Sequence, residues 1–527
     1  MLKQRAASGA GHLFIGNTLS QIIQGLGIIL VARLLGATNY GLYTLLLVPS
    51  ATFFVFTQVG FGGATARYVA YYNALGKNVE ADGIATSTYL YAAILYAFIS
   101  LVSIVAAPAY ASYILHQPTI AYLAQLASVT IFFQGLMNYT TAALNGYYKT
   151  KQVSAIMLIQ SFTKTALSIG LILIGLHIYG ALIGTIVSFA LAAIAGTIWL
   201  FKTTRTRQLK FDAKTFKTVT SFGLPLYAAN ILNGVSRQIQ LVILASFASA
   251  AAVGAFTATQ NLATLISIVA YPVSTMAGVA FSEVSAQNSK AKINSSYVSA
   301  TKIATTLVVP ISIFLALTAK PVVTILYGSI YSRFYLLLSI FATGYLAVGV
   351  GGQTQGSLFG GLNNTKLNTY SAAISAAILL SASLGLAIRL SVFGVAIATT
   401  ISTVLTAAVM HILIVRGLGV RLPKMKLAAV YLASAVSAIP LVFIPQTIFH
   451  HGVIGLLELA AILAIYIVVY STVLPLVRGV SKQELELISH SLKGVPILGH
   501  VLAALTRYSG LFVHERGENP SYQKTQS

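Results

Sequence analysis

Two cationic side chains lie inside long apolar stretches of the sequence, where a charge is costly and needs a compensating role. Lys164 is near the middle of one stretch, about 12 residues or about 18 Å from either end of a helix, and Arg237 is similarly deep in another. An ammonium group cannot comfortably reach water over that distance, so it needs a polar partner or a wet cavity. A guanidinium binds phosphate through a fork of donors, and an ammonium binds it as a point charge. The two residues therefore predict a cationic site for an anionic ligand.

Amide side chains accompany these cations at helical spacing. Gln160 and Ser168 share a helix face with Lys164 at i, i+4 and i+8. A second set surrounds Arg237 with spacing i, i+3, i+7 and i+10, and a third set lies near the start of the chain, where an internal repeat places its counterpart. The amides in these polar stripes are Asn17, Gln21, Gln24, Gln160, Asn230, Asn233 and Gln240. The alternative for each amide is a hydrogen bond that joins two membrane helices.

The composition requires that membrane helices hold these residues. Of 527 residues, 57% are hydrophobic and 8% are charged, with a net charge of +23, whereas a soluble domain has about 25% charged residues. A soluble enzyme is excluded. The absence of cysteine excludes disulfides, thiolate catalysis and Cys-ligated metals. The nine histidines show no ligand spacing, and His450-His451 is only a weak metal signal, so we predict no metal and no cofactor.

Long uncharged stretches, divided at Gly, Pro and polar residues, predict fourteen membrane-spanning helices, or twelve if the last pair is misread. Their centres lie near residues 23, 53, 95, 132, 164, 190, 234, 266, 310, 347, 378, 403, 437 and 464. The first apolar stretch is long enough to be a span rather than a cleavable signal peptide. The predicted fold class is an all-α polytopic membrane protein.

Along the chain, loops rich in basic residues alternate with loops that are poor in them. Segments on one side hold 26 of the 32 Lys and Arg residues, and four lie in loops on the other side: Arg33, Lys320, Arg333 and Arg389. The positive-inside rule then places both termini in the cytoplasm, in the plasma membrane of the cell. The basic loops are expected to orient the chain and contact anionic membrane lipids, with no nucleic acid as partner.

An internal repeat with a nearly constant offset divides the chain. Tyr40-Gly41-Leu42-Tyr43 recurs as Val253-Gly254-Ala255-Phe256, and Tyr179-Gly180-Ala181 recurs as Phe393-Gly394-Val395. Six spans separate the copies, so the copies have the same topology. This predicts a six-helix lobe over 1–201, a basic cytoplasmic linker over 202–217, a second lobe over 218–415, two additional helices over 416–475, and a tail over 476–527 that is partly interfacial or disordered.

The sequence resembles the Wzx-like polysaccharide transporter or oligosaccharide flippase family, which belongs to the multidrug/oligosaccharidyl-lipid/polysaccharide flippase superfamily. The likeness runs from about Gly16 to Val415. It rests on the order and spacing of Ala32-Arg33-Leu34-Leu35-Gly36, Tyr40-Gly41-Leu42-Tyr43, Gly60-Phe61-Gly62, Arg67-Tyr68-Val69-Ala70, Phe222-Gly223-Leu224-Pro225, Val253-Gly254-Ala255-Phe256, Ser282-Glu283 and Phe393-Gly394-Val395.

The resemblance implies two six-helix lobes in a V shape that open alternately to each side, with the polar stripes beside a central cleft. It also implies a substrate of sugars on a polyprenyl phosphate or pyrophosphate, flipped outward for envelope polysaccharide or glycoprotein assembly. Glycan-assembly enzymes would be further partners. Two departures put carboxylate-based ion coupling in doubt: Gln58 replaces a common acidic residue, and Ser236-Arg237 replaces a common Asp-Arg pair.

Other charged residues lie near predicted helix ends. Arg33, Arg67 and Arg389 are expected to anchor the interface or to contribute to a gate or headgroup contact. Glu283 is expected to pair with a neighbouring cation, and Glu458, the only acid deep in a span, to form a local hydrogen bond. Pro225, Pro272 and Pro310 are expected to kink cavity helices.

Three rival functions are weighed against the flippase. A membrane glycosyltransferase would need carboxylates on its catalytic side, and the predicted outer loops contain no Asp or Glu. A multidrug exporter of the same superfamily favours acidic cavity residues, which the first twelve spans lack at mid-depth. A non-transporting membrane scaffold leaves the two buried cations without a role. We therefore expect a transporter and not an enzyme.

Overall fold

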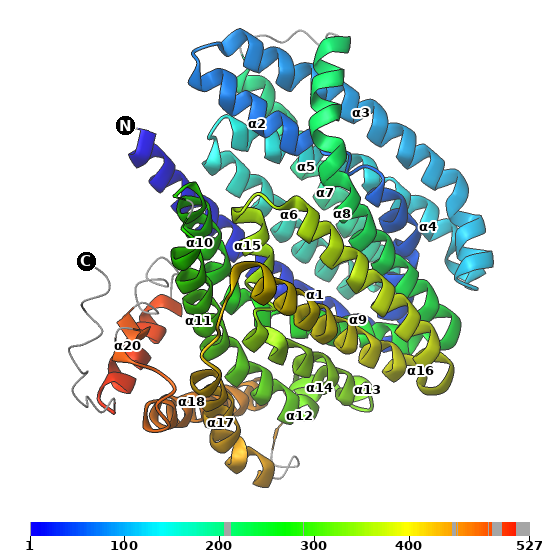
Figure 1. The fold of residues 1–527 in the computed structure, drawn as a ribbon. Helices are drawn as coiled ribbons and strands as arrows, with labels where there is room; N and C mark the ends of the chain where they lie inside the picture. The colour runs from blue at the N-terminus through cyan, green and yellow to red at the C-terminus, as the bar shows by residue number, and fades with distance from the viewer. Residues whose placement is uncertain are drawn as a thin grey trace. The chain divides into compact units, whose positions relative to one another are not determined.

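The computed structural model describes residues 2–204, 212–287, 289–444, 449–450, 452–482, 484–486 and 498–512. Within these residues the regular secondary structure is helical, without strands (Figure 1). Nine of the described helical segments are long and apolar enough to cross a membrane, or ten if one bent pair counts as a span. The predicted all-α polytopic membrane fold is therefore confirmed, and the chain is a multi-pass membrane protein.

All fourteen predicted span centres lie in helices, although several predicted spans are joined end to end. Three segments hold two predicted spans each: Gly16–Val55, Thr150–Thr203 and Lys366–Leu418. Helices dominate because lipid offers the backbone no hydrogen-bond partners, so each segment must satisfy its own N–H and C=O groups.

The chain forms two compact units that are interleaved in sequence. The first unit contains α1 (Leu2–Val55), α2 (Phe61–Ala74), α3 (Asn78–Ala109), α4 (Ala121–Ser128), α5 (Thr130–Gly146), α6 (Thr150–Leu171), α7 (His177–Thr203), α8 (Ala213–Phe247), α9 (Ala250–Thr264), α12 (Ala319–Tyr327), α13 (Ser329–Ser332), α14 (Tyr335–Gly344) and most of α16 (Thr365–Leu418). The second contains α10 (Ile266–Ala286), α11 (Lys290–Leu317), a 3-10 segment (Tyr345–Val350), α15 (Gln355–Gly361), the end of α16, α17 (Lys424–Phe443), α18 (Val453–Leu476) and α20 (Leu498–Gly510).

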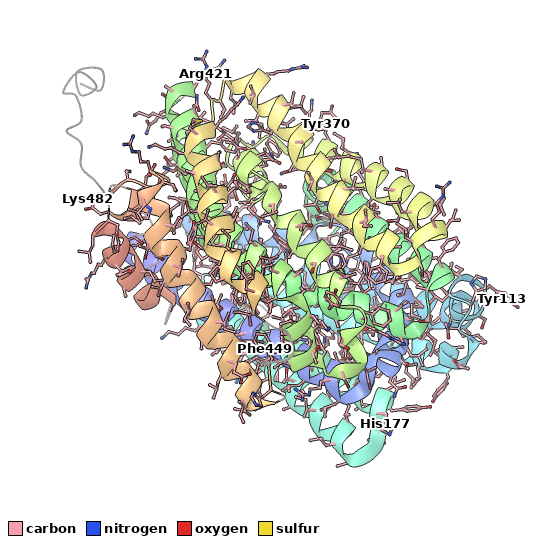
Figure 2. The ribbon with its side chains drawn as sticks, turned by 90° about the horizontal axis from the view of Figure 1, so that it is seen from below. Tyr113, His177, Tyr370, Arg421, Phe449 and Lys482 are labelled. Atoms are coloured by element: carbon pink, nitrogen blue, oxygen red, sulfur yellow. The ribbon has the colours of Figure 1, made fainter. Side chains whose placement is uncertain are left out.

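The helix bounds repeat along the chain with the offset seen in the sequence. α3 corresponds to α11, α4 and α5 correspond to α14 and α15, and α6 with α7 corresponds to α16. The breaks inside the last pair match closely: His177 has φ 40° and ψ −123°, and Ser391, at the equivalent position of the second copy, has φ 50° and ψ −129°. Figure 2 shows His177 at the turn between two helices. The repeat is therefore a property of the backbone as well as of the sequence.

In the first unit, α1 bends at Gly36 (φ 72°, ψ 167°) and then crosses α9. A Cβ on Gly41 would lie 1.7 Å from the Ala250 carbonyl oxygen, and a Cβ on Gly254 would lie 2.1 Å from that of Ala37. Only glycine permits this approach, because the atoms in the way are backbone. The glycines of the two motif copies thus meet where α1 crosses α9.

In the second unit, an ion pair ties the segment after α18 to α11 and α17. Lys302 is 4% exposed and its Nζ lies 2.5 Å from Glu484 Oε2, while Lys426 Nζ lies 3.8 Å from Oε1. Ser481 and Glu484 form a capping box, each side chain accepting from the other backbone N–H. Burial alone would raise the pKa of Glu484, but Lys302 and the Ser481 N–H hold that pKa below its usual value.

Parts of the predicted linker and tail lie outside the described residues. These parts are 205–211 of the linker and 483, 487–497 and 513–527 of the tail. Within the tail, α20 is helical where an interfacial helix was predicted, and it packs against α18. The predicted lobe boundaries and the interfacial position of this helix remain predictions.

Candidate functional site

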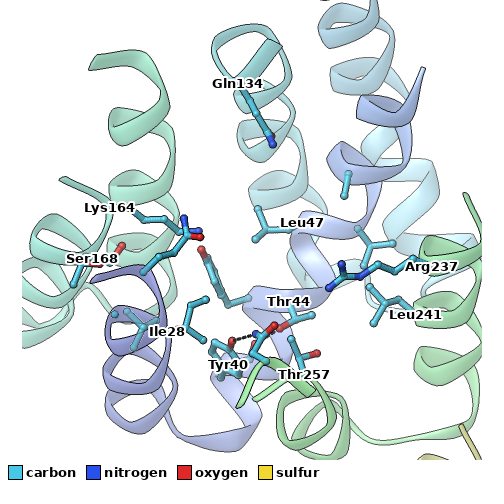
Figure 3. Close-up of a pocket in the computed structure, with 18 of the residues that line it drawn as sticks. Ile28, Tyr40, Thr44, Leu47, Gln134, Lys164, Ser168, Arg237, Leu241 and Thr257 are labelled. Atoms are coloured by element: carbon cyan, nitrogen blue, oxygen red, sulfur yellow. Dashed lines mark hydrogen bonds between the residues drawn. The ribbon is translucent and has the colours of Figure 1, made fainter. Parts of the chain in front are cut away.

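The first unit contains a cavity of about 450 Å³ lined by α1, α5, α6, α8 and α9 (Figure 3). Its lining combines apolar side chains with hydroxyls, amides and two cations. The lining residues are Gln24, Gly27, Ile28, Val31, Tyr40, Tyr43, Thr44, Leu47, Val48, Ala51, Gln134, Lys164, Thr165, Ser168, Arg237, Gln238, Leu241, Thr257 and Asn261. A volume of this size accommodates the polar part of a drug-sized or larger ligand.

The two cations singled out from the sequence both line this cavity. Lys164 reaches it from α6 and Arg237 from α8, on opposite sides in Figure 3. Among the described residues, neither side chain has an ion-pair or hydrogen-bond partner. No Asp or Glu is among the lining residues, so two positive charges face the cavity without a compensating carboxylate.

Gln24 is the amide from the predicted stripes that joins the cations at the cavity wall. Its Nε2 donates to Gln160 Oε1 over 3.3 Å. Gln160 is buried behind the wall and does not line the cavity. Gln160 therefore positions Gln24. Helix spacing alone cannot distinguish a residue with this supporting role from one that lines the cavity.

The other predicted amides do not line the cavity. Gln240 is buried and donates to Thr399 Oγ1 over 2.6 Å, which joins α8 to α16. Asn230 and Asn233 are exposed elsewhere on α8. The remaining two, Asn17 and Gln21, are half-buried on α1 before the turns that reach the cavity. The alternative of helix-to-helix hydrogen bonding thus describes Gln240, and it also describes the bond from Gln24 on α1 to Gln160 on α6.

Several lining residues were not predicted from the sequence. Tyr40 and Tyr43 belong to the repeated motif, so their sequence signal was present but was read only as a repeat. Asn261 Nδ2 donates to Tyr40 Oη over 3.4 Å, and Tyr43 shares a 2.7 Å hydrogen bond with Thr185. Gln134 extends into the cavity from α5 (Figure 3). Only tertiary packing brings these separate spans together.

Two of the predicted gate or anchor arginines have definite contacts. Arg33 Nη1 donates to the Ile325 carbonyl oxygen, 2.9 Å away at the end of α12. Arg67 is exposed, with its guanidinium carbon 6.0 Å from the centroid of the Tyr68 ring. Arg389 is exposed just before the break at Ser391. None of the three lines the cavity.

Two expectations about the positions and pairing of acidic residues were wrong. Glu283 is exposed and forms no ion pair with any described residue, and the nearby Lys292 instead donates to Gln287 over 2.9 Å. Glu458 is not deep in its span, because α18 begins at Val453. It does form the local hydrogen bond that was expected. Its carboxylate accepts from the His450 backbone N–H at 2.9 Å and lies 2.6 Å from His450 Nδ1, so it holds the preceding loop.

Within the described part of the chain, no three His, Asp or Glu side chains gather as metal ligands would. The site therefore consists of two cations, amides, hydroxyls and tyrosines around a cavity in an apolar helix bundle. Such a set can bind an anion through charge and a polar, hydroxyl-rich group through hydrogen bonds.

A family model shows the family of this chain, and solved structures show its fold. A family model described as "Polysaccharide biosynthesis protein" matches residues 30–335. The structure is similar to the lipid II flippase MurJ in an inward closed conformation, with a TM-score of 0.71 and 17% identity over 87% of this chain and 98% of that chain. It is also similar to an inward-facing multidrug resistance MATE family transporter of the MOP superfamily, with a TM-score of 0.66 and 16% identity over 80% and 98%.

An outward-facing MATE family transporter gives a TM-score of 0.54 and 17% identity over 81% of this chain and 95% of that one. No curated protein matches the sequence. At these identities the structural likeness shows a shared fold, and the family match covers more than half of the chain.

Proposed function

Because this chain belongs to the polysaccharide biosynthesis protein family, we propose that it is a flippase for an oligosaccharide linked to a polyprenyl phosphate or pyrophosphate. It moves this lipid from the inner to the outer leaflet by alternating access, for envelope polysaccharide or glycoprotein assembly. The protein carries out no chemical step; it binds the substrate, shields its polar part from lipid, and releases it on the other side. Its partners are the lipid-linked oligosaccharide, the surrounding lipids and the enzymes that assemble the glycan.

The observation that carries this proposal is the uncompensated pair of cations in the cavity, Lys164 and Arg237. Charges in a membrane interior are rare because leaving water costs several kcal/mol. An anionic headgroup would supply the counter-charge that no lining residue provides. A phosphate or pyrophosphate suits the fork of Arg237 and the point charge of Lys164.

The rest of the lining supports a sugar beside the phosphate. Gln24, Gln134, Gln238 and Asn261 offer amide donors and acceptors, and Tyr40 with Tyr43 offers hydroxyls and ring faces. Sugars are bound through such groups because each hydroxyl both donates and accepts. A cavity that lacked these groups would suit a simple anion equally well.

A multidrug exporter is the second candidate, and the fold likeness to multidrug resistance MATE transporters favours it. Export of cationic drugs would place a positive ligand beside two positive side chains, which costs free energy in a low dielectric. The sign of the lining charge therefore favours an anionic substrate over a cationic one.

The proposed orientation places both termini in the cytoplasm of a cell whose plasma membrane contains the protein. The distribution of basic residues supports it, because positively charged segments stay on the cytoplasmic side. The turns near Arg33, Lys320 and Arg389 would then face outward.

The test measures flipping of a lipid-linked oligosaccharide in proteoliposomes. Arg237→Ala and Lys164→Ala should each lower the flipping rate by about tenfold or more, because a hydrogen bond to a charged group is worth about 1.5–3 kcal/mol. Arg237→Lys should retain an intermediate rate, since it keeps the charge and loses the fork.

Arg421→Ala is the matched control, because it removes an exposed arginine that does not line the cavity and has no predicted role in a gate. Its flipping rate should equal that of the unmodified chain. Full activity of the Lys164→Ala/Arg237→Ala double variant, inserted in the membrane at normal levels, would exclude the cationic site. Transport of a cationic dye with no flipping would favour the exporter instead.

A further inference from the structure

Three hydrogen bonds join the two copies of the repeat around the bend of α1. The Tyr331 hydroxyl of α13 donates to the Ala32 carbonyl over 2.8 Å, and Arg33 donates to the Ile325 carbonyl of α12 over 2.9 Å. On the far side of Gly36, Asn261 of α9 donates to the Tyr40 hydroxyl over 3.4 Å. In each case one partner is on α1 in the first copy and the other is in the second copy.

The partner of Arg33 is a helix end rather than a carboxylate. Ile325 is in the last turn of α12, where carbonyl oxygens have no donor within the helix. The negative end of the helix dipole lies at the same place and favours a nearby cation. The contact therefore gives the Ile325 carbonyl a hydrogen-bond donor and places the Arg33 charge at the negative end of the helix dipole. A carbonyl alone, or a helix dipole alone, would hold the guanidinium only weakly.

These contacts lie directly behind one end of the cavity. Tyr40 and Asn261 line the cavity and are joined by a hydrogen bond, and Figure 3 shows Tyr40 below Lys164 and Arg237. Tyr40 is only 4% exposed. Beyond it, the close backbone contact of Gly41 with α9 leaves no room even for a Cβ. Passage through this end requires α1 to separate from α9, α12 and α13.

We propose that Arg33, Tyr331 and the Tyr40–Asn261 pair form a latch that holds this end of the cavity closed and must open before a substrate can leave through it. The role in substrate release rests on the proposed flippase function. The role in closing the cavity does not, because it concerns only contacts within the protein. Arg33 and Tyr331 act in the latch as gating residues and do not line the cavity, whereas Tyr40 and Asn261 belong to the latch and to the cavity wall.

Tyr327 and Tyr331 provide a matched pair for testing the latch. Their ring centroids are 5.3 Å apart and both side chains are almost fully buried. Each hydroxyl donates to a main-chain carbonyl, Tyr331 to Ala32 and Tyr327 to Ala258 over 2.9 Å. The first bond joins the two repeat copies, whereas the second lies within the second copy. Tyr→Phe at the two positions removes similar bonds, and only one of them belongs to the latch.

The experiment uses the full chain in proteoliposomes and exploits the absence of native cysteine. Thr257→Cys places a reporter thiol in the cavity wall. Lys320→Cys, an exposed residue at the start of α12, identifies the side of the membrane at the latch. A membrane-impermeant maleimide is added from that side, and the rate of Thr257→Cys labelling reports how often the latch end opens.

Labelling should be slow in the reporter alone and at least about fivefold faster with Tyr331→Phe or Arg33→Gln, because each removes one bond across the latch. Tyr327→Phe should leave the rate unchanged while lowering thermal stability about as much as Tyr331→Phe. The labelling rate with Arg33→Lys should fall between the rates with Arg33→Gln and with the unmodified residue. Arg33→Lys replaces Arg33→Gln in the test if the latter is not inserted into the membrane.

Equal acceleration by Tyr327→Phe and Tyr331→Phe would overturn the latch, as would unchanged labelling with both Tyr331→Phe and Arg33→Gln. The labelling rate is measured without substrate, so the latch can be tested even if the proposed flippase function is wrong. A wrong orientation is recognised separately in intact cells, because Lys320→Cys would then not react with an impermeant maleimide added outside.

Discussion

Lys164 and Arg237 are costly residues in a membrane helix, and the cavity explains how the fold accommodates them. Both side chains line a cavity of about 450 Å³ whose wall also carries hydroxyl and amide groups. Hydroxyls and amides there can solvate the charges in part, and water can enter a cavity of this size. Both residues could be identified from their positions far inside apolar stretches of the sequence, because a charge in the middle of a membrane helix is rare.

Backbone strain is a second residue-scale feature, and it recurs in the two copies of the repeat. His177 and Ser391 have positive φ values of 40° and 50° at corresponding breaks. A non-glycine residue in such a conformation costs about 1–3 kcal/mol. Ser391 recovers part of this by donating from Oγ to the Phe247 carbonyl over 2.7 Å, which closes the turn onto the end of α8.

His177→Gly should therefore stabilise the protein. Relief of the strain outweighs the larger entropy that glycine has in the unfolded chain, about 0.5–1 kcal/mol, so we expect a net gain of about 1 kcal/mol. The measurement is the melting temperature of the purified protein in detergent. Ser391→Gly should gain less, because it also loses the bond to Phe247. A lower melting temperature for His177→Gly would contradict the strain assigned to this turn.

At the scale of elements, the crossing of α1 and α9 is the tightest helix contact on the wall of the cavity. The two glycines of the repeated motif remove both side chains from the crossing, so the backbones touch. Small residues have this role in membrane bundles because lipid provides no hydrophobic drive for helices to associate. The two copies of the repeated motif thus pack against each other at this crossing.

Gly41→Ala should be destabilising by about 1–3 kcal/mol, as overpacking is in other tight cores. The added Cβ would meet the Ala250 carbonyl oxygen at 1.7 Å, and a backbone atom cannot rotate away. Gly385→Ala is the control, since a Cβ there meets nothing within 4 Å on a helix of similar length. The measurement is the melting temperature of each variant in detergent, which should be lower for Gly41→Ala than for Gly385→Ala. Equal melting temperatures would contradict the close contact of α1 with α9.

At the scale of the whole molecule, the all-helical fold, the duplicated helix bounds and the family agree with what the sequence predicted. The match over residues 30–335 shows that the chain belongs to a family of polysaccharide biosynthesis proteins. The compact units do not follow the order of the chain, because α12, α14 and part of α16 belong to the same unit as Met1–Leu265. A linear division of the sequence cannot express such interleaving.

The orientation of the whole chain is tested with single cysteines in the naturally cysteine-free sequence. Lys320→Cys should react with an impermeant maleimide added outside intact cells. Lys149→Cys and Lys366→Cys should react only after the membrane is opened, because basic residues concentrate on the cytoplasmic side. Labelling of Lys320→Cys and Lys366→Cys from the same side would contradict the proposed topology.

Local composition and regular spacing are enough to predict the fold class, the helix positions, the repeat and the two cations. Tertiary structure decided which side chains share a cavity. Helical spacing defines a face of one helix but not the neighbour that the face meets, so Gln24 lines the wall, Gln160 supports it and Gln240 binds another helix. Tyr40, Gln134 and Asn261 come from three different spans. Only packing of helices distant in sequence could bring them beside Lys164 and Arg237.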